Sequence, residues 1–241
     1  MKKINTILAA VGALLMLTVS SANSVEFKAG VSANGMAAYA NAKETLKGNG
    51  TAATGIGGRE TNEEAVLATS YASLFLEIAS DEMMGLGIGV SYAPEVVDLD
   101  KETRHIGGNN GDSGNDANGG VQSASAKIND MVSLYVTMPV GENGAYAKAG
   151  YIQATMVTEE SLATGSKYQD VDMSGYQIGG GYEGTLGDAV FWRAEGSYQM
   201  WDDLSANGSE ANNTAASDHS TNRITAEIGS VTGSLSIGMK F

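Results

Sequence analysis

The chain of 241 residues contains no cysteine and only two prolines. The absence of cysteine excludes a disulfide framework, a thiolate metal site and a cysteine nucleophile. The 32 glycines argue against a helical bundle, because glycine weakens helices. Stability must therefore come from backbone pairing and from the burial of side chains.

Basic residues and long apolar runs are also scarce. The chain has 14 Lys and Arg against 28 Asp and Glu, a net charge of −14. This sign disfavours nucleic-acid binding, which depends on positive side chains at the phosphates. After residue 24 no segment is apolar over the roughly 20 residues that a membrane-spanning helix needs. Short segments of alternating character remain, which favour either a soluble exported β-sandwich or an outer-membrane β-barrel.

The first 24 residues differ from the rest of the chain. Lys2 and Lys3 precede an apolar run over residues 7–17, and small and polar residues follow. This layout predicts a secretory signal peptide cleaved after Ser24. An uncleaved anchor is the less favoured alternative, because the run is short for a bilayer. Cleavage would leave residues 25–241 as one domain with a net charge of −16.

The last eleven residues give the clearest strand signal. Apolar side chains alternate with small or polar ones, and the chain ends on an aromatic residue. The final apolar positions are Leu235, Ile237, Met239 and Phe241. One apolar and one polar face over about ten residues is typical of a transmembrane β-strand. This ending resembles the C-terminal strand by which bacterial outer-membrane barrels are recognised for assembly, and it favours the barrel over the sandwich.

Seven further strands are predicted from similar but less regular alternation, over residues 25–42, 65–79, 86–92, 132–140, 145–157, 171–184 and 190–201. The connections alternate in length. The short ones are residues 80–84, 141–144 and 185–189, and the long polar ones are residues 43–64, 98–124, 158–170 and 203–222. Short periplasmic turns and long extracellular loops predict an all-β fold, a transmembrane antiparallel up-and-down β-barrel of eight strands.

Aromatic residues lie near the predicted strand ends, where they could form two interfacial girdles. The girdle at the short turns would contain Tyr146, Tyr182, Trp192 and Phe241. The girdle at the long loops would contain Tyr39, Tyr92 and Trp201. Ordinary core aromatics are the alternative.

Three segments carry a resemblance to a known family. They are SLYVTMPVGENGAYAKAGY (133–151), FWRAEGSYQMW (191–201) and SLSIGMKF (234–241). On these segments the chain resembles the small OmpA/Opacity-type outer-membrane barrels, loosely over the whole of residues 25–241. The resemblance implies an outer-membrane location and an interior in which Arg or Lys pairs with Glu, but it implies no catalytic motif.

Six charged residues fall on predicted inner faces: Arg193, Glu195, Glu183, Glu77, Lys148 and Lys28. We expect them to form ion pairs, because an unpaired buried ion is costly. They could form a gate in a narrow pore or a structural plug. The plug is favoured, since the interior of an eight-stranded barrel is just wide enough for side chains to fill.

Residues that could bind metal or act in catalysis fall in the predicted loops. His105 and His219 are surrounded by Gly, Asn and Ser, which offer no ordered frame. A calcium-loop pattern that begins at Asp98 lacks the glycine at position six and the glutamate at position twelve. The adjacent residues 218–220 (Asp-His-Ser) do not face one another as a catalytic triad requires. We therefore expect no enzyme, no cofactor and no metal site.

The predicted function is that of an integral outer-membrane protein with a structural role and porin-like permeability to small solutes. The alternative is a surface adhesin or ligand-recognition protein that acts through its long acidic loops. The expected partners are outer-membrane lipid, lipopolysaccharide, the barrel-assembly machinery and loosely bound divalent cations, with no nucleic acid. A monomer is expected.

Overall fold

The computed structural model describes residues 25–46, 59–80, 84–98, 102–105, 121–161, 168–211 and 221–241. The predicted signal peptide, residues 1–24, lies outside this part of the chain, and its cleavage stays a prediction. Within the described ranges no helix is long and apolar enough to cross a membrane.

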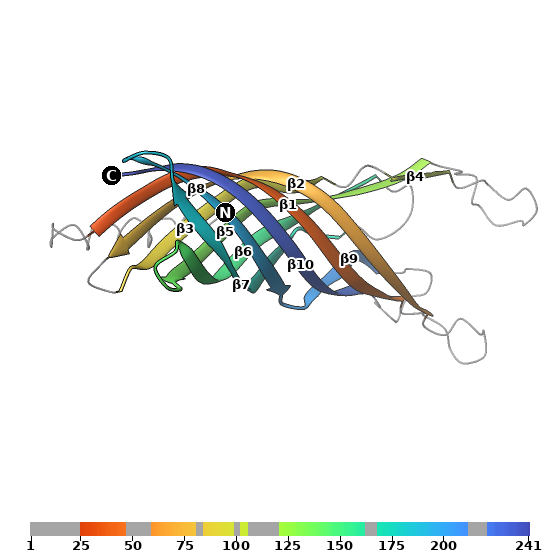
Figure 1. The fold of residues 1–241 in the computed structure, drawn as a ribbon. Helices are drawn as coiled ribbons and strands as arrows, with labels where there is room; N and C mark the ends of the chain where they lie inside the picture. Colours follow the sequence, from red (N-terminus) through yellow and green to blue (C-terminus); the bar gives the residue numbers. More distant parts are fainter. Residues whose placement is uncertain are drawn as a thin grey trace, which may run out of the picture.

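The described residues form ten strands of one antiparallel sheet (Figure 1). They are β1 (Val25–Leu46), β2 (Arg59–Ser80), β3 (Leu86–Asp98), β4 (Glu102–His105), β5 (Val121–Pro139), β6 (Ala145–Ser161), β7 (Val171–Thr185), β8 (Val190–Trp201), β9 (Leu204–Ala211) and β10 (Thr221–Lys240). Strand β4 follows β3 and pairs with the same neighbour, β5. Strand β9 likewise follows β8 and pairs with β10. The sheet therefore has eight positions around its wall.

The sheet closes because β1 pairs with β2 on one side and with β10 on the other. Following the paired residues once around the wall from Lys28 leads back to β1 at Ala38, ten residues further along. This shear requires strongly tilted strands, and in an eight-stranded barrel it leaves an interior that side chains fill. The fold is an antiparallel up-and-down β-barrel, as predicted, and it is the fold that the resemblance to small outer-membrane barrels implies.

The two ends of the barrel differ. At one end, here called the turn rim, short turns join the strands and contain glycines with positive φ, namely Gly85, Gly141, Gly144 and Gly187. At Gly144 a Cβ atom would lie 2.3 Å from the carbonyl oxygen of Glu183, so only glycine fits this turn. Phe241 also lies at the turn rim, where its backbone pairs with that of Phe27. The opposite end is here called the loop rim.

Side chains alternate between an outer and an inner face. The outer face carries a set of exposed apolar residues, here called the apolar belt: Val31, Leu74, Leu76, Leu134, Val136, Ile178, Val231, Leu235, Ile237 and Met239. The inner face carries mainly small and polar residues, such as Ser32, Ser133 and Gln177, which are buried. The apolar belt thus points away from the centre of the molecule, whereas a soluble sandwich exposes polar side chains on its outer faces.

All four predicted long loops overlap strands of the structure, including 158–170, into which β6 continues as far as Ser161. Strand β1 continues to Leu46 and β2 begins at Arg59, inside the predicted loop 43–64. Strands β4 and β5 occupy parts of the predicted loop 98–124, and β9 and β10 occupy parts of 203–222. These boundaries were misplaced because the alternation of polar and apolar residues ends where the apolar belt ends, whereas the backbone pairing of the strands continues beyond it.

Both prolines lie where a ladder ends. Pro94 follows the last β3 residues that pair with β2, since the ladder between these strands runs only from Leu74 to Ser80 on β2. Pro139 is the last residue of β5, next to a turn. Proline has no backbone N–H, so it cannot donate to a neighbouring strand.

Aromatic residues form parts of both predicted girdles. At the turn rim the Tyr182 and Trp192 rings lie 5.7 Å apart on the outer face. Towards the loop rim the hydroxyls of Tyr39 and Tyr198 are hydrogen-bonded at 2.8 Å. Two assignments were wrong, because Tyr146 is buried inside the barrel and Trp201 packs against an internal apolar cluster. Both residues have the inner-face parity of their strands.

Candidate functional site: the barrel interior

A buried ion-pair cluster fills the interior near the turn rim. Arg193 of β8 forms two hydrogen bonds to the carboxylate of Glu77 on β2, at 2.8 and 2.6 Å. The exposed fractions of these side chains are 3% and 1%. Arg193 Nε also donates to Glu183 of β7 at 2.8 Å. Lys28 of β1 donates to both oxygens of Glu183, at 2.9 and 3.0 Å.

The register explains why these four residues meet. Lys28 lies opposite Glu77 in the β1–β2 ladder, and Glu183 lies opposite Arg193 in the β7–β8 ladder. Each residue has the inner-face parity of its strand, so the two cross-strand pairs point at one another across the narrow interior. These two positive and two negative groups balance one another, as do Lys240 and Glu26, which pair with Glu183 and Lys28, and this balance offsets part of the cost of removing the buried ions from water.

Aromatic rings enclose the buried guanidinium group. Its central carbon lies 5.3 Å from the ring centre of Phe75, 5.4 Å from that of Tyr146 and 5.1 Å from that of Phe191. Ring faces attract a desolvated cation. The aromatic residues therefore hold Arg193 in place and exclude water from its pair with Glu77.

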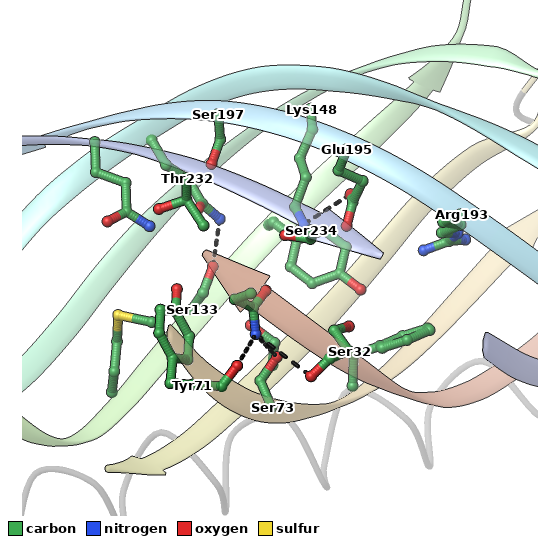
Figure 2. Close-up of a pocket in the computed structure, with 17 residues that line it drawn as sticks. Ser32, Tyr71, Ser73, Ser133, Lys148, Arg193, Glu195, Ser197, Thr232 and Ser234 are labelled. Carbon is green, nitrogen blue, oxygen red and sulfur yellow. Dashed lines mark hydrogen bonds and ion pairs between the residues drawn. The ribbon is translucent and has the colours of Figure 1, made fainter. Parts of the chain in front are cut away.

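A second ion pair lies deeper in the barrel. Lys148 Nζ of β6 is 3.0 Å from Glu195 Oε1 of β8, and both side chains are largely buried. The ammonium group also lies over the ring of Tyr135, 4.2 Å from its centre. Figure 2 shows this pair, with Arg193 set apart from it towards one side. The interior thus contains one separate pair and the larger cluster, which Glu26, 3.1 Å from Lys28, and Lys240, 3.8 Å from Glu183, extend at the turn rim.

The middle of the interior is lined by hydroxyl and amide groups (Figure 2). Many of them bond to each other between neighbouring strands, as in Ser32 to Ser236 at 2.8 Å and Ser230 to Gln199 at 2.7 Å. The remaining cavity measures about 40 Å³. That is room for about three water molecules. The hydroxyl oxygen of Thr232 faces this cavity and has no partner among the described residues.

An apolar cluster closes the interior towards the loop rim. Its buried members are Met36, Ala93, Val96, Val97, Met131 and Ala154. Leu67, Tyr71, Ile128 and Trp201 pack against it. By contrast, a hollow of about 210 Å³ opens at the turn rim and reaches Arg193 and Glu77. In the described residues, side chains therefore close the interior in two layers, the ion-pair cluster and the apolar cluster.

The structure places all six predicted charged residues on the inner face. It joins Lys28, Glu77, Glu183 and Arg193, and it pairs Lys148 separately with Glu195. The predicted C-terminal set lies on the outer face instead. The exposed fractions are 67% for Leu235, 52% for Ile237, 48% for Met239 and 73% for Phe241.

Sequence reasoning missed the aromatic enclosure and the apolar cluster. Phe75 and Phe191 are apolar residues on inner-face positions, where polar residues were expected. A usable signal for the apolar cluster was present in β1, whose inner-face positions change from Ser32 and Asn34 to Met36. Such a change along one parity indicates that the barrel interior becomes apolar.

The loop residues considered for metal or catalysis are only partly described. His105 lies on β4, whereas His219 and its neighbours lie outside the described residues. Asp98 forms an ion pair with Lys127 at 3.2 Å. No group of three or more potential metal-binding side chains occurs within the described ranges. The expectations that the protein binds no metal and is not an enzyme stay predictions.

No protein-family model matches the chain, and no curated protein matches it. Solved structures similar to it include the outer membrane protein OprG from Pseudomonas aeruginosa, with 15% identity over 90% of this chain and 96% of that chain, at a TM-score of 0.45. The outer membrane protease OmpT from Escherichia coli has 13% identity over 92% and 99% of the two chains, at a TM-score of 0.46. The attachment invasion locus protein Ail of Yersinia pestis has 12% identity over 88% and 99%, at a TM-score of 0.36. The fold assignment of the present chain rests on its own strand register.

Proposed function

We propose that the protein is an integral protein of a bacterial outer membrane, with the turn rim in the periplasm and the loop rim outside the cell. The exposed apolar belt supports this location, because only lipid makes such a surface favourable. The closed register supports it as well, since a barrel leaves no unpaired edge within the membrane. The predicted signal peptide provides the export that this location requires.

We further propose that the barrel is a closed anchor and that the strands beyond the apolar belt present a recognition surface. The observation that carries this proposal is the closed interior. Arg193 and Glu77 are almost fully buried in one layer, the apolar cluster forms a second, and the cavity between them holds only a few water molecules. A barrel closed in this way favours a structural role over steady conduction.

The outer part of the barrel is long, paired and acidic. The β1–β2 ladder continues to the pair of Leu46 and Arg59, and β9 continues the wall beyond β8 at the same rim by pairing with β10. Described acidic side chains in this part include Glu44, Glu60, Glu63, Glu64, Asp98, Asp203 and Glu227. A rigid, charged surface held outside the membrane suits the binding of an external partner.

Planar-bilayer recording of the purified full chain tests the closed anchor. The wild-type protein should give no discrete openings under an applied voltage of either sign. Steady openings of wild-type protein would contradict the closed anchor. Binding of a soluble partner should be lost when the acidic residues of the outer strands are neutralised, while the barrel remains folded.

A gated pore is the second candidate function. It is favoured by one observation, namely that Glu183 bonds to both Lys28 and Arg193 and so offers Arg193 a second partner when Glu77 moves away. Openings that appear in Glu77→Gln and are absent in wild-type protein would support the gate. Silence of both proteins would support the anchor.

A further inference from the structure

The seam between β1 and β10, here called the closing seam, differs from the other seams of the wall. Every other ladder of the described residues joins strands that follow one another closely in the chain, whereas β1 and β10 are its two ends (Figure 1). Ser32 and Ser236, which are hydrogen-bonded across the closing seam, are 204 residues apart. Bringing such distant residues together costs the most chain entropy. We therefore expect the closing seam to form after its neighbours.

The closing seam has little side-chain contact of its own. Gly30 of β1 lies opposite Gly238 of β10, and Gly35 lies opposite Gly233. At Gly35 and Gly233 the place of a Cβ atom has no neighbouring heavy atom of the described residues within 4 Å. Cross-strand side-chain pairs are a main source of sheet stability, so these glycine pairs contribute little. The strands on either side of the seam supply the missing contacts.

Two phenylalanine rings from these flanking strands cover the glycines inside the barrel. Phe75 of β2 lies opposite Gly30, and a Cβ atom on this glycine would lie 2.6 Å from the ring. Phe191 of β8 lies opposite Gly238, where a Cβ atom would lie 2.5 Å from the ring. The two rings meet edge to face, with their centres 6.1 Å apart. The glycines thus make room for a contact between β2 and β8, whose backbones are not paired.

The buried ions connect the same two sides of the closing seam. Arg193 of β8 bonds to Glu77 of β2, and Lys28 of β1 bonds to a carboxylate of β7. Both connections join the hairpin of β1 and β2 to the C-terminal strands. Lys28 and Glu77 lie on one side of the seam, and Arg193 and Glu183 lie on the other. These four charges therefore balance on each side before closure, and closure adds hydrogen bonds without leaving an ion unpaired.

A tyrosine crosses the closing seam on the outer face. Tyr39 of β1 lies opposite Gly229 of β10, where a Cβ atom would overlap the tyrosine ring. The ring extends over this glycine, and its hydroxyl is hydrogen-bonded to that of Tyr198 on β8 at 2.8 Å. An aromatic side chain over a glycine thus bridges the seam on both faces of the wall.

We propose that Phe75, Phe191, Tyr39 and the bonded pair of Arg193 and Glu77 form a closing latch, which docks last in folding and sets how slowly the barrel opens. The closing latch joins strands whose backbones are not paired with each other, so it forms only after the closing seam has aligned them. Contacts that form late in folding change the rate of unfolding and leave the rate of folding almost unchanged. This inference does not rest on the proposed location or on the recognition surface.

The first test compares folding and unfolding rates of the full chain in detergent micelles, followed by the fluorescence of Trp192 and Trp201. Phe191→Leu should unfold roughly tenfold faster than the wild-type protein, the size expected for a lost aromatic pair and its packing. Its folding rate should stay within about twofold of the wild-type rate. Tyr135→Leu is the matched control, because this ring covers Gly89 at the seam of β3 and β5, which are close in the chain. It should slow folding.

Phe75→Leu removes the other ring of the pair and should give the same two rates as Phe191→Leu. An unfolding rate equal to that of the wild-type protein in both variants would overturn the proposal. A folding rate that falls as far in them as in Tyr135→Leu would overturn it as well.

A disulfide across the closing seam separates the latch from ordinary packing, since the chain has no cysteine of its own. Ser32→Cys/Ser236→Cys places the two thiols where hydroxyls now lie 2.8 Å apart. In the oxidised protein the effect of Phe191→Leu on the unfolding rate should disappear, because the seam can no longer open. The control is Ser91→Cys/Ser133→Cys, whose serines lie opposite each other in the β3–β5 ladder. Its disulfide should leave the tenfold effect unchanged.

Two outcomes of the disulfide experiment contradict the closing latch. One is an effect of Phe191→Leu that survives the disulfide at the closing seam, and the other is an effect that both disulfides abolish. A barrel that opens at another seam is still a closed barrel, so either outcome leaves the proposed function intact.

Discussion

Neutralising Glu77 is the perturbation that most directly probes the buried ion-pair cluster. Glu77→Gln keeps the size of the side chain but removes the charge that faces Arg193, whose exposed fraction is 3%. Removing one partner of a fully buried pair costs roughly 3–5 kcal/mol, because the other ion stays buried without compensation. Arg193 retains Glu183 at 2.8 Å, so we expect the lower end of this range, about 3 kcal/mol.

The assay is reversible urea unfolding in lipid vesicles, followed by the fluorescence of the two tryptophans, Trp192 and Trp201. Lys43→Gln is the control, because its partner Glu60 is exposed and such pairs contribute about 0–1 kcal/mol. The double variant Glu77→Gln/Arg193→Met should lose less stability than the sum of the two single variants, since the residues interact directly. A loss in Glu77→Gln no larger than that in Lys43→Gln would refute the reasoning.

Three further predictions concern the outer face, a close packing contact and the interior. Leu235→Arg, in the middle of the apolar belt, should destabilise the barrel by about 2–4 kcal/mol in the same urea assay, because the new charge would face lipid. Gly89→Val should destabilise the barrel in the same assay, because a Cβ atom there would lie 2.4 Å from the buried ring of Tyr135, which would have to shift. Ser197→Cys introduces the sole thiol beside the central cavity, and a bulky charged thiol reagent should label it far more slowly in folded than in urea-unfolded protein; equal rates would contradict the closed interior.

The sequence predicts the strands in which polar and apolar residues alternate. In β8 and β10 one face carries apolar residues that point outward, and the other carries polar residues that point into the barrel. The alternation of the two therefore predicts both the strands and which face points inward. The inner-face placement of Arg193 and Glu77 follows from the same parity. The distance between the two side chains cannot be predicted from parity. Arg193 lies on β8 and Glu77 on β2, which are distant in the sequence and come together only because the barrel closes.

In the outer parts of β1 and β2 the alternation of polar and apolar residues ends before the strands do. Beyond the apolar belt both faces of β1 and β2 carry polar residues, so the residues up to Leu46 and from Arg59 look like a loop although their backbones are paired. Tyr146 shows the opposite difficulty. It lies one residue after the start of β6, where an aromatic residue suggests a girdle, but its parity directs the ring inward to Arg193.

The central claim, a closed barrel embedded in the outer membrane, is tested most directly by electrophoretic migration of the full chain extracted in detergent from the outer-membrane fraction. Closed barrels keep every backbone hydrogen bond paired within the wall, so they resist the denaturing detergent until heated. The account predicts a fast-migrating form in the unboiled sample that shifts to the position of the unfolded chain after boiling. Identical migration of both samples, with the protein recovered in the soluble fraction, would contradict it.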